Sequence, residues 1–131
     1  DNPGSLSSNS VLSLEEDRRG RIWIGTWAGG LNRLDPRTGE FIRYQHDPAA
    51  PGNRTIGNNN IFHIVEDKEG WLWLSVWNFG LQRFNPETGE FVSFHFSDPD
   101  DPSGLHNGSI NAIEASRQGH YWIGGYMGLE K

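Results

Sequence analysis

The sequence predicts an all-β fold in which one four-stranded antiparallel unit is repeated along the chain. Three observations lead to this prediction. The 131-residue chain matches itself when it is shifted by 50 residues. Each unit contains four short apolar segments, separated by turns that are rich in Gly, Pro and Asp. Helix signals are absent from the chain.

The repeat is visible position by position. A third copy follows the second at a shift of 49 residues and stops at Lys131, so the chain holds about two and a half units. In this third copy, Gly119 and Trp122 follow Gly70 and Trp73. The matched pairs of the first two copies include Asp17/Asp67, Gly20/Gly70, Trp23/Trp73, Trp27/Trp77, Gly30/Gly80, Leu31/Leu81, Arg33/Arg83 and Pro36/Pro86.

The first unit shows how the four strands are defined. Residues 11–14 are the first predicted strand, and residues 17–20 form a tight turn in which Gly20 can take a positive φ. Residues 21–25 are a continuous apolar run, which is typical of a strand covered on both faces. A Gly-rich loop leads to the third strand, residues 31–34. A turn containing Pro36 and Gly39 then leads to the fourth strand, residues 41–44.

Four-stranded antiparallel units of 40–50 residues that cover one another are typical of the blades of a β-propeller. An all-β sandwich has no reason to repeat at 50 residues, and the coils of a β-solenoid are usually shorter. We therefore expect a partial β-propeller over residues 1–131, with blades at about 5–48 and 55–99 and an incomplete blade at about 105–131. Ten strands are expected, because the third blade should lack its outer pair. Trp23, Trp73 and Trp122 are expected to pack between blades.

Composition excludes several classes of function. The chain has no Cys, so it has neither disulfides nor thiolate metal sites. Its net charge of -6, without a Lys or Arg cluster, argues against nucleic acid or an anionic membrane as partner. No apolar run approaches the roughly 18 residues of a membrane span. The five His lack the paired spacing of a zinc site, and no catalytic motif is present, so we expect no metal, cofactor or catalytic residue.

These motifs resemble the two-component regulator propeller repeat. The resemblance rests on an Asn/Ser-rich start, an Asp-x-x-Gly turn, a Trp-containing second strand and a Gly-Leu-x-Arg third strand, and it covers nearly the whole chain. Two departures are Ser75 in place of Gly25 and Ser116 in place of the turn Asp. The matching segments of the first copy are residues 6–11, Asp17 to Gly20, Ile22 to Thr26 and Gly30 to Pro36.

The resemblance implies a segment of the extracytoplasmic, periplasmic sensor of a bacterial hybrid two-component system. Such a segment is not itself an enzyme, although its parent protein can carry a histidine kinase. In such receptors, rings of blades perceive a ligand outside the membrane, commonly a carbohydrate. The resemblance therefore implies a non-catalytic sensing role with an oligosaccharide as a possible ligand.

Candidate ligand-binding residues gather at one rim of the predicted blades. Loops alternate between the two ends of a meander, so the loops between second and third strands share a rim with the stretches between blades. Aromatic rings beside amides suit a sugar, although residues that repeat in each blade also suit packing. Asn78, Phe79 and His63 are added because they break the repeat, and Arg54 is added because it lies between blades, where it could meet an acidic group. The candidates are Trp27, Trp77, Asn78, Phe79, Tyr126, Asn59, Asn60, Arg54 and His63.

Two alternatives stay open. One is a propeller enzyme acting on polysaccharide as a lyase or glycosidase, in which His63 and Arg54 would be the residues of interest. The other is a scaffold or self-association module. Since two and a half blades cannot close a ring, an open arc would expose apolar blade faces. Other blades of the parent protein or further copies of the chain are then the expected partners.

Overall fold

The computed structural model describes residues 5–77, 79–95, 110–115, 121–125 and 128–130. In this part of the chain, three antiparallel sheets form, and consecutive strands are neighbours in each sheet. The one helical element described is a short 3₁₀ turn, η1 (Gly52–Arg54), and no described helix is long and apolar enough to cross a membrane. The strands are β1 (Val11–Glu16), β2 (Ile22–Thr26), β3 (Leu31–Asp35), β4 (Glu40–Tyr44), β5 (Ile61–Glu66), β6 (Leu72–Val76), β7 (Gly80–Phe84), β8 (Phe91–His95), β9 (Ile110–Ala115), β10 (Tyr121–Gly125) and β11 (Gly128–Glu130).

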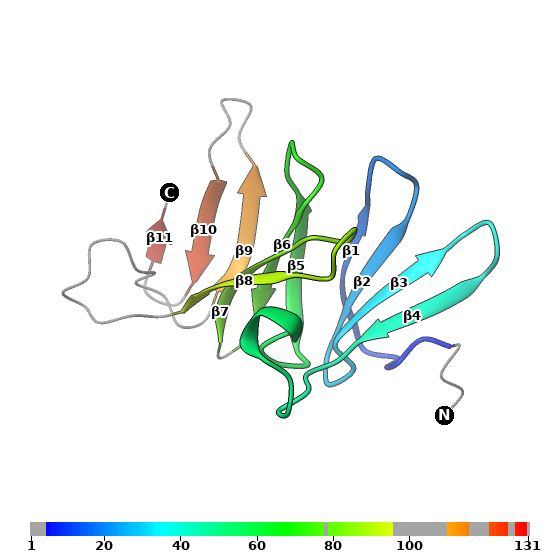
Figure 1. The fold of residues 1–131 in the computed structure, drawn as a ribbon. Coiled ribbons are helices and arrows are strands. Elements are labelled where there is room, and N and C mark those ends of the chain that lie inside the picture. The colour runs from blue at the N-terminus through cyan, green and yellow to red at the C-terminus, as the bar shows by residue number, and fades with distance from the viewer. Residues whose placement is uncertain (1–4, 78, 96–109, 116–120, 126–127, 131) are drawn as a thin grey trace.

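The three sheets stand side by side as consecutive blades (Figure 1). The first strand of the second blade, β5, contacts the first strands of both neighbours, β1 and β9, so these are the innermost strands, and β4 and β8 lie at the outer edges. Even the irregularities repeat, because the β1–β2 and β5–β6 ladders each shift register at the same place in the blade. This arrangement confirms the predicted all-β propeller fold.

The third sheet corrects the expected strand count. Sequence patterns predict two strands there, but the structure contains a third, β11, in which Gly128 pairs with Gly125 of β10. The Gly-Leu pair at the start of the third strand in the other blades recurs as Gly128 and Leu129, and both residues pair with β10. Eleven strands are therefore described instead of the ten expected.

The main core lies between the first two blades. Trp23 of β2 is fully buried and meets Phe84 of β7 edge to face, with the ring centroids 5.8 Å apart. Tyr44 also contacts both rings. Burial of an indole ring stabilises the fold by roughly 4–6 kcal/mol, from an area of about 150–250 Å². The predicted packing role of Trp23 is thereby confirmed.

The second blade shows opposite faces to its two neighbours. Leu72, Leu74 and Val76 alternate along β6 and face the first blade, in one cluster with Trp23. Trp73 points the other way and packs with Leu81 against Ile113 of β9. Trp73 therefore also lies between blades, as predicted, whereas the side chain of Trp122 lies outside the described residues.

In the second blade, the face that packs on the first blade carries Ile64. The corresponding face of the first blade has no neighbouring blade among the described residues. Leu14 corresponds to Ile64 in the repeat, yet Leu14 is 65% exposed and Ile64 is 3% exposed. Val11 is exposed in the same way, whereas its equivalent Ile61 is buried. The first blade thus carries the apolar face of a stacked blade without a described neighbour on that side.

A buried carboxylate organises the first turn of each of these two blades. Asp17 accepts hydrogen bonds from the backbone N–H groups of Arg19 and Arg21, from the Arg21 Nε (2.6 Å) and from the Trp23 indole (2.8 Å). Asp67 repeats the backbone bonds and accepts from the Trp73 indole at 3.0 Å. The Asp of the Asp-x-x-Gly motif therefore both fixes the turn and orients the tryptophan that packs between blades.

A buried amide on the third strand ties down the segment that leads into each blade. Asn32 exchanges hydrogen bonds with Ser7, and Gln82 accepts one from the backbone N–H of Gly57 (2.8 Å). Residues 7 and 57 are equivalent in the repeat, as are residues 32 and 82. The amide thereby sets where the leading segment crosses its own blade.

We predict that alanine substitution at the matched pair Ile64 and Leu14 has unequal effects. Ile64→Ala leaves a cavity between blades and should lower the free energy of unfolding by about 2–5 kcal/mol. Leu14→Ala removes an exposed side chain and should change it by less than about 0.5 kcal/mol. Urea denaturation of dilute, monomeric protein measures both values. Equal losses would show that the first blade is covered in the same way as the second.

Candidate functional site

An exposed aromatic cluster lies at the rim formed by the β2–β3 and β6–β7 loops, which we call the loop rim. Trp27 is 44% exposed and Trp77 is 38% exposed. Their ring centroids are 5.8 Å apart at an interplanar angle of 58°, and Phe62 of β5 lies 6.2 Å from Trp27. The structure therefore brings two candidate residues together across two blades, in a position open to solvent.

The loop that carries Trp27 is held in an unusual backbone conformation. Ala28 has a φ of 67°, a left-handed value that costs a non-glycine residue about 1–3 kcal/mol. Its N–H donates to the side-chain oxygen of Asn60, which belongs to the next blade. The N–H of Trp27 donates to the carbonyl of Ser10 (2.9 Å), and that of Trp77 donates to the carbonyl of Asn60 (3.0 Å). The backbone is thus held by hydrogen bonds at both Trp27 and Trp77.

Asn59 and Asn60 support the rim by bonding to the backbone. The Asn59 side-chain oxygen accepts from the N–H of His46 (2.7 Å), and the Asn59 carbonyl accepts from the N–H of Gly30 (2.7 Å). Both partners belong to the first blade or its exit. The two asparagines therefore position the aromatic loop and the exit segment, whatever further role their amide nitrogens have.

Phe79 forms one wall of a cavity of about 320 Å³ beside this rim. A Cβ atom added to Gly57 would lie 2.3 Å from the Phe79 ring, so the ring rests directly on the glycine backbone. His46, Asp47 and Ser93 also line the cavity. Sequence reasoning selected Phe79 because it breaks the repeat, but it missed the His46, Asp47 and Ser93 side chains, which converge only in the folded chain.

The remaining candidates do not join the aromatic cluster. His63 lies on the innermost strand β5, opposite Ser75. Arg54 lies in η1, which contacts the outermost strand β8, and its guanidinium donates to the carbonyl of Thr88 (3.2 Å). The structure therefore places these two residues at opposite edges of one sheet. Asn78 and Tyr126 lie outside the described residues.

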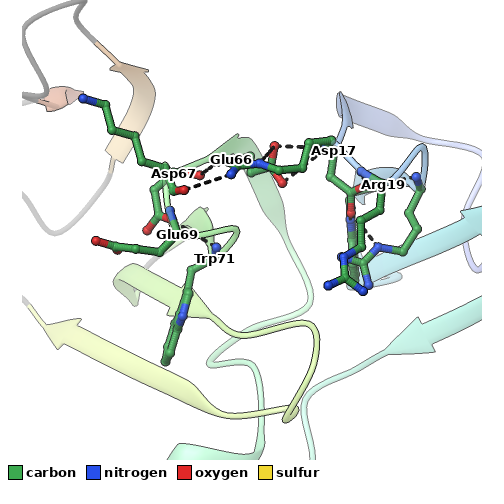
Figure 2. A network of polar contacts seen from close by, with 10 residues as sticks. Asp17, Arg19, Glu66, Asp67, Glu69 and Trp71 are labelled. Carbon is green, nitrogen blue, oxygen red and sulfur yellow. Dashed lines mark hydrogen bonds and ion pairs between the residues drawn. The ribbon is translucent and has the colours of Figure 1, made fainter.

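The opposite rim carries the β1–β2 and β5–β6 turns and joins the first two blades by charge (Figure 2). Arg18 donates its backbone N–H to the carboxylate of Glu66 (3.1 Å) and its guanidinium to the carbonyls of Asp67 (2.7 Å) and Lys68 (2.9 Å). Figure 2 shows Glu66 between the two turns. Arg19 and Arg21 both pair with Glu87, at 3.5 Å and 3.2 Å. A cavity of about 280 Å³ lies among these residues.

The pKa values of two carboxyl groups near this interface are shifted in opposite directions. Burial raises the pKa of Glu15, and the negative charges of Glu66 and Asp17 raise it further. Burial also acts to raise the pKa of Asp17, but its hydrogen bonds with Trp23 and Arg21 and the charge of Arg21 outweigh burial and lower it. Asp17 therefore remains ionised and stabilises its turn.

Among the residues that the structure describes, no group of three or more His, Asp or Glu side chains could hold a metal ion.

Sequence reasoning also missed the link from Arg18 to Glu66. Its only sequence signal is a pair of opposite charges about one repeat apart, and this pattern says nothing about which blades touch.

Comparison with known proteins agrees with the repeat. Residues 5–28 and 55–78 match the family model described as two component regulator propeller. The two matches begin 50 residues apart, which is the period of the sequence. Each match runs from the leading segment through the turn aspartate to the aromatic loop. No curated protein matches the chain.

Solved structures share the fold. The extracellular domain of BT3049 from B. thetaiotaomicron, described as a hybrid two component system, is 29% identical with a TM-score of 0.79, over 90% of this chain. PorZ, a surface component of the type-IX secretion system of Porphyromonas gingivalis, is 19% identical with a TM-score of 0.69 over 91% of the chain. The extracellular domain of BT4673 from B. thetaiotaomicron, described as a one component system, is 18% identical with a TM-score of 0.58 over 98%. The chain spans 16%, 17% and 22% of the length of these three solved chains.

We predict that Asp17→Asn destabilises the protein at neutral pH and has less effect in acid. The folded pKa of Asp17 lies below the unfolded value of about 3.9, so its stabilisation is complete above that pH and is lost as the pH falls through the folded pKa. Asp17→Asn should cost about 2 kcal/mol at pH 7, and the gap to the natural protein should narrow as the pH falls below about 4. Urea denaturation across this range measures it.

Asp35→Asn is the matched control, because Asp35 also accepts a backbone N–H, from Arg37, but at an exposed turn. It should change the free energy of unfolding by less than about 0.5 kcal/mol. A loss for Asp17→Asn that is as large at pH 3 as at pH 7 would contradict the role of the charge.

Proposed function

Because the chain carries repeats of the two component regulator propeller family, we propose that it is a non-catalytic, ligand-sensing segment of an extracytoplasmic bacterial sensor and that its ligand is a carbohydrate. The neighbour BT3049, of which the corresponding part is an extracellular domain, supports a periplasmic or extracellular location. The function of the whole parent protein is part of this proposal, since the chain spans only 16% of that neighbour.

The exposed pair Trp27 and Trp77 is the observation that carries the proposal. Two rings that each remain more than a third exposed, and whose backbone N–H groups are hydrogen-bonded, are available for contact with something outside the blade pair. Flat aromatic faces stack against the C–H groups of sugars, and polar groups nearby can bond sugar hydroxyls. Because Trp27 and Trp77 come from successive blades, a chain-like saccharide could contact both.

We predict that Trp77→Ala weakens the binding of an oligosaccharide roughly tenfold, which corresponds to about 1.4 kcal/mol. Isothermal titration calorimetry against a panel of neutral and acidic oligosaccharides first identifies a ligand and then compares the variants. Trp71→Ala is the control of the same residue type, because Trp71 lies on the opposite rim, beneath the Arg83 guanidinium. Equal weakening by both substitutions, or no heat with any saccharide, would contradict the proposal.

A second role, association through the open face of the first blade, is favoured by the exposed Leu14 and Val11. The equivalent residues of the second blade are buried beneath Trp23 of its neighbour. The open face therefore fits a blade that presents a tryptophan in the same place, from the parent ring or from another copy of the chain.

We predict that this chain by itself associates at micromolar concentration and that Leu14→Glu shifts it toward monomer. The reason is that a charge in the stacked face would have to be buried without a partner. Multi-angle light scattering over a concentration series measures the change. Glu40→Lys, on the outer strand β4, is a control that should leave the mass unchanged. A well-folded monomer at all concentrations would contradict this second role.

A further inference from the structure

The cavity beside Phe79 is a pocket of the size that small ligands occupy. Its volume of about 320 Å³ lies at the lower end of the usual range of about 300–1,000 Å³. It lies between the second blade and the segment that follows the first blade. One of its lining residues, Phe79, belongs to the same β6–β7 loop as Trp77. Residues that line it include His46, Asp47, Pro48, Thr55, Phe79 and Ser93.

The apolar part of this cavity is held rigidly. The Phe79 ring rests on Gly57, where any larger residue would collide with it at 2.3 Å. Gly57 is fixed in turn by its hydrogen bond to the buried side chain of Gln82 (2.8 Å). Pro48 adds a second apolar group with restricted backbone freedom. Phe79 and Pro48 therefore give the cavity an apolar side that can contact C–H groups.

Two polar side chains of the cavity, His46 and Asp47, have hydrogen-bonding atoms left for a ligand. The Nδ1 of His46 lies 2.7 Å from the carbonyl of Ile56, which can only accept, so Nδ1 is the donor of this bond and the tautomer that it selects has Nε2 as an acceptor. Asp47 accepts from the N–H of Ala49 through one oxygen, and an ionised carboxylate has further acceptor sites. Two acceptors therefore line the cavity.

Ser93 supplies the complementary group. Its oxygen accepts from the Gln82 side chain (3.1 Å), so its hydroxyl hydrogen can be donated to a ligand. Thr55 differs, because its hydroxyl already accepts from the N–H of Asp47 (2.8 Å) and donates to the carbonyl of Ile56 (3.2 Å). The described lining contains one carboxylate and no Lys or Arg.

We propose that this cavity is a subsite for a neutral sugar residue, whose hydroxyls donate to Asp47 and His46 and accept from Ser93 while its C–H face lies on Phe79. The Asp47 carboxylate would repel a uronic acid or sulfated residue, since no described lining cation compensates it. This inference rests on the proposed carbohydrate-sensing function and adds the class of sugar that the protein selects.

The experiment titrates the chain with neutral gluco- and xylo-oligosaccharides and with oligogalacturonates by calorimetry. We expect a neutral oligosaccharide to bind at least tenfold more tightly than any oligogalacturonate. Ser93→Ala should weaken the neutral ligand about threefold to tenfold. Asp47→Asn should weaken it similarly and should also strengthen the binding of oligogalacturonate, because the repelling charge is gone. Asp35→Asn, which removes a carboxylate of the same turn type outside the cavity, should change neither.

An NMR measurement localises the ligand independently of affinity. The ring C–H resonances of His46 should shift when the neutral oligosaccharide is added, and thermal melts of each variant show that it is folded. If neutral saccharides bind and respond to Trp77→Ala but to neither Asp47→Asn nor Ser93→Ala, the subsite is overturned while the proposed function stands. Preference for oligogalacturonate also overturns the subsite. If no saccharide binds, both are overturned.

Discussion

In each of the first two blades, a buried carboxylate, that of Asp17 or Asp67, connects the first turn of the blade to the packing between blades. Their bonds to backbone N–H groups set the turn, and their bonds to the Trp23 and Trp73 indoles orient the rings that meet the next blade. Because both carboxylates are buried, each must keep all of these donors to offset the loss of water. Ser116 takes this position in the third repeat, where only a neutral hydroxyl is available.

Both carboxylates are also neutralised by a guanidinium, but from different places. Arg21, at the start of the second strand, pairs with Asp17 at 2.6 Å, whereas Arg83 of β7 pairs with Asp67 at 2.7 Å. Trp71 stands where the first blade has Arg21, and Arg83 stacks over it at 4.4 Å. In these two blades, one electrostatic requirement is therefore met by arginines at two different positions of the repeat.

The repeat and its glycines made the strands and turns predictable, because both are local: Gly20 and Gly70 adopt positive φ in equivalent turns, and Trp23 packs as expected. Alternation of loops likewise predicted that Trp27 and Trp77 share a rim. The contacts of Arg18 and Arg54, and the convergence of His46 with Ser93, could not be predicted in this way. They depend on the angle between blades and on the path of residues 46–57, for which the sequence pattern has no periodic signal.

The amide bonds of Asn32 and Gln82 have a consequence for the order of folding. Each reaches back only 25 residues, to Ser7 and Gly57, so a blade can secure its leading segment before the following blade has left the ribosome. Contacts of such short sequence separation form quickly, whereas stacking between blades joins residues about 50 apart, such as Arg18 and Asp67. A nascent chain of this design would therefore add completed blades one at a time, and each new blade would cover the apolar face left open at the growing end.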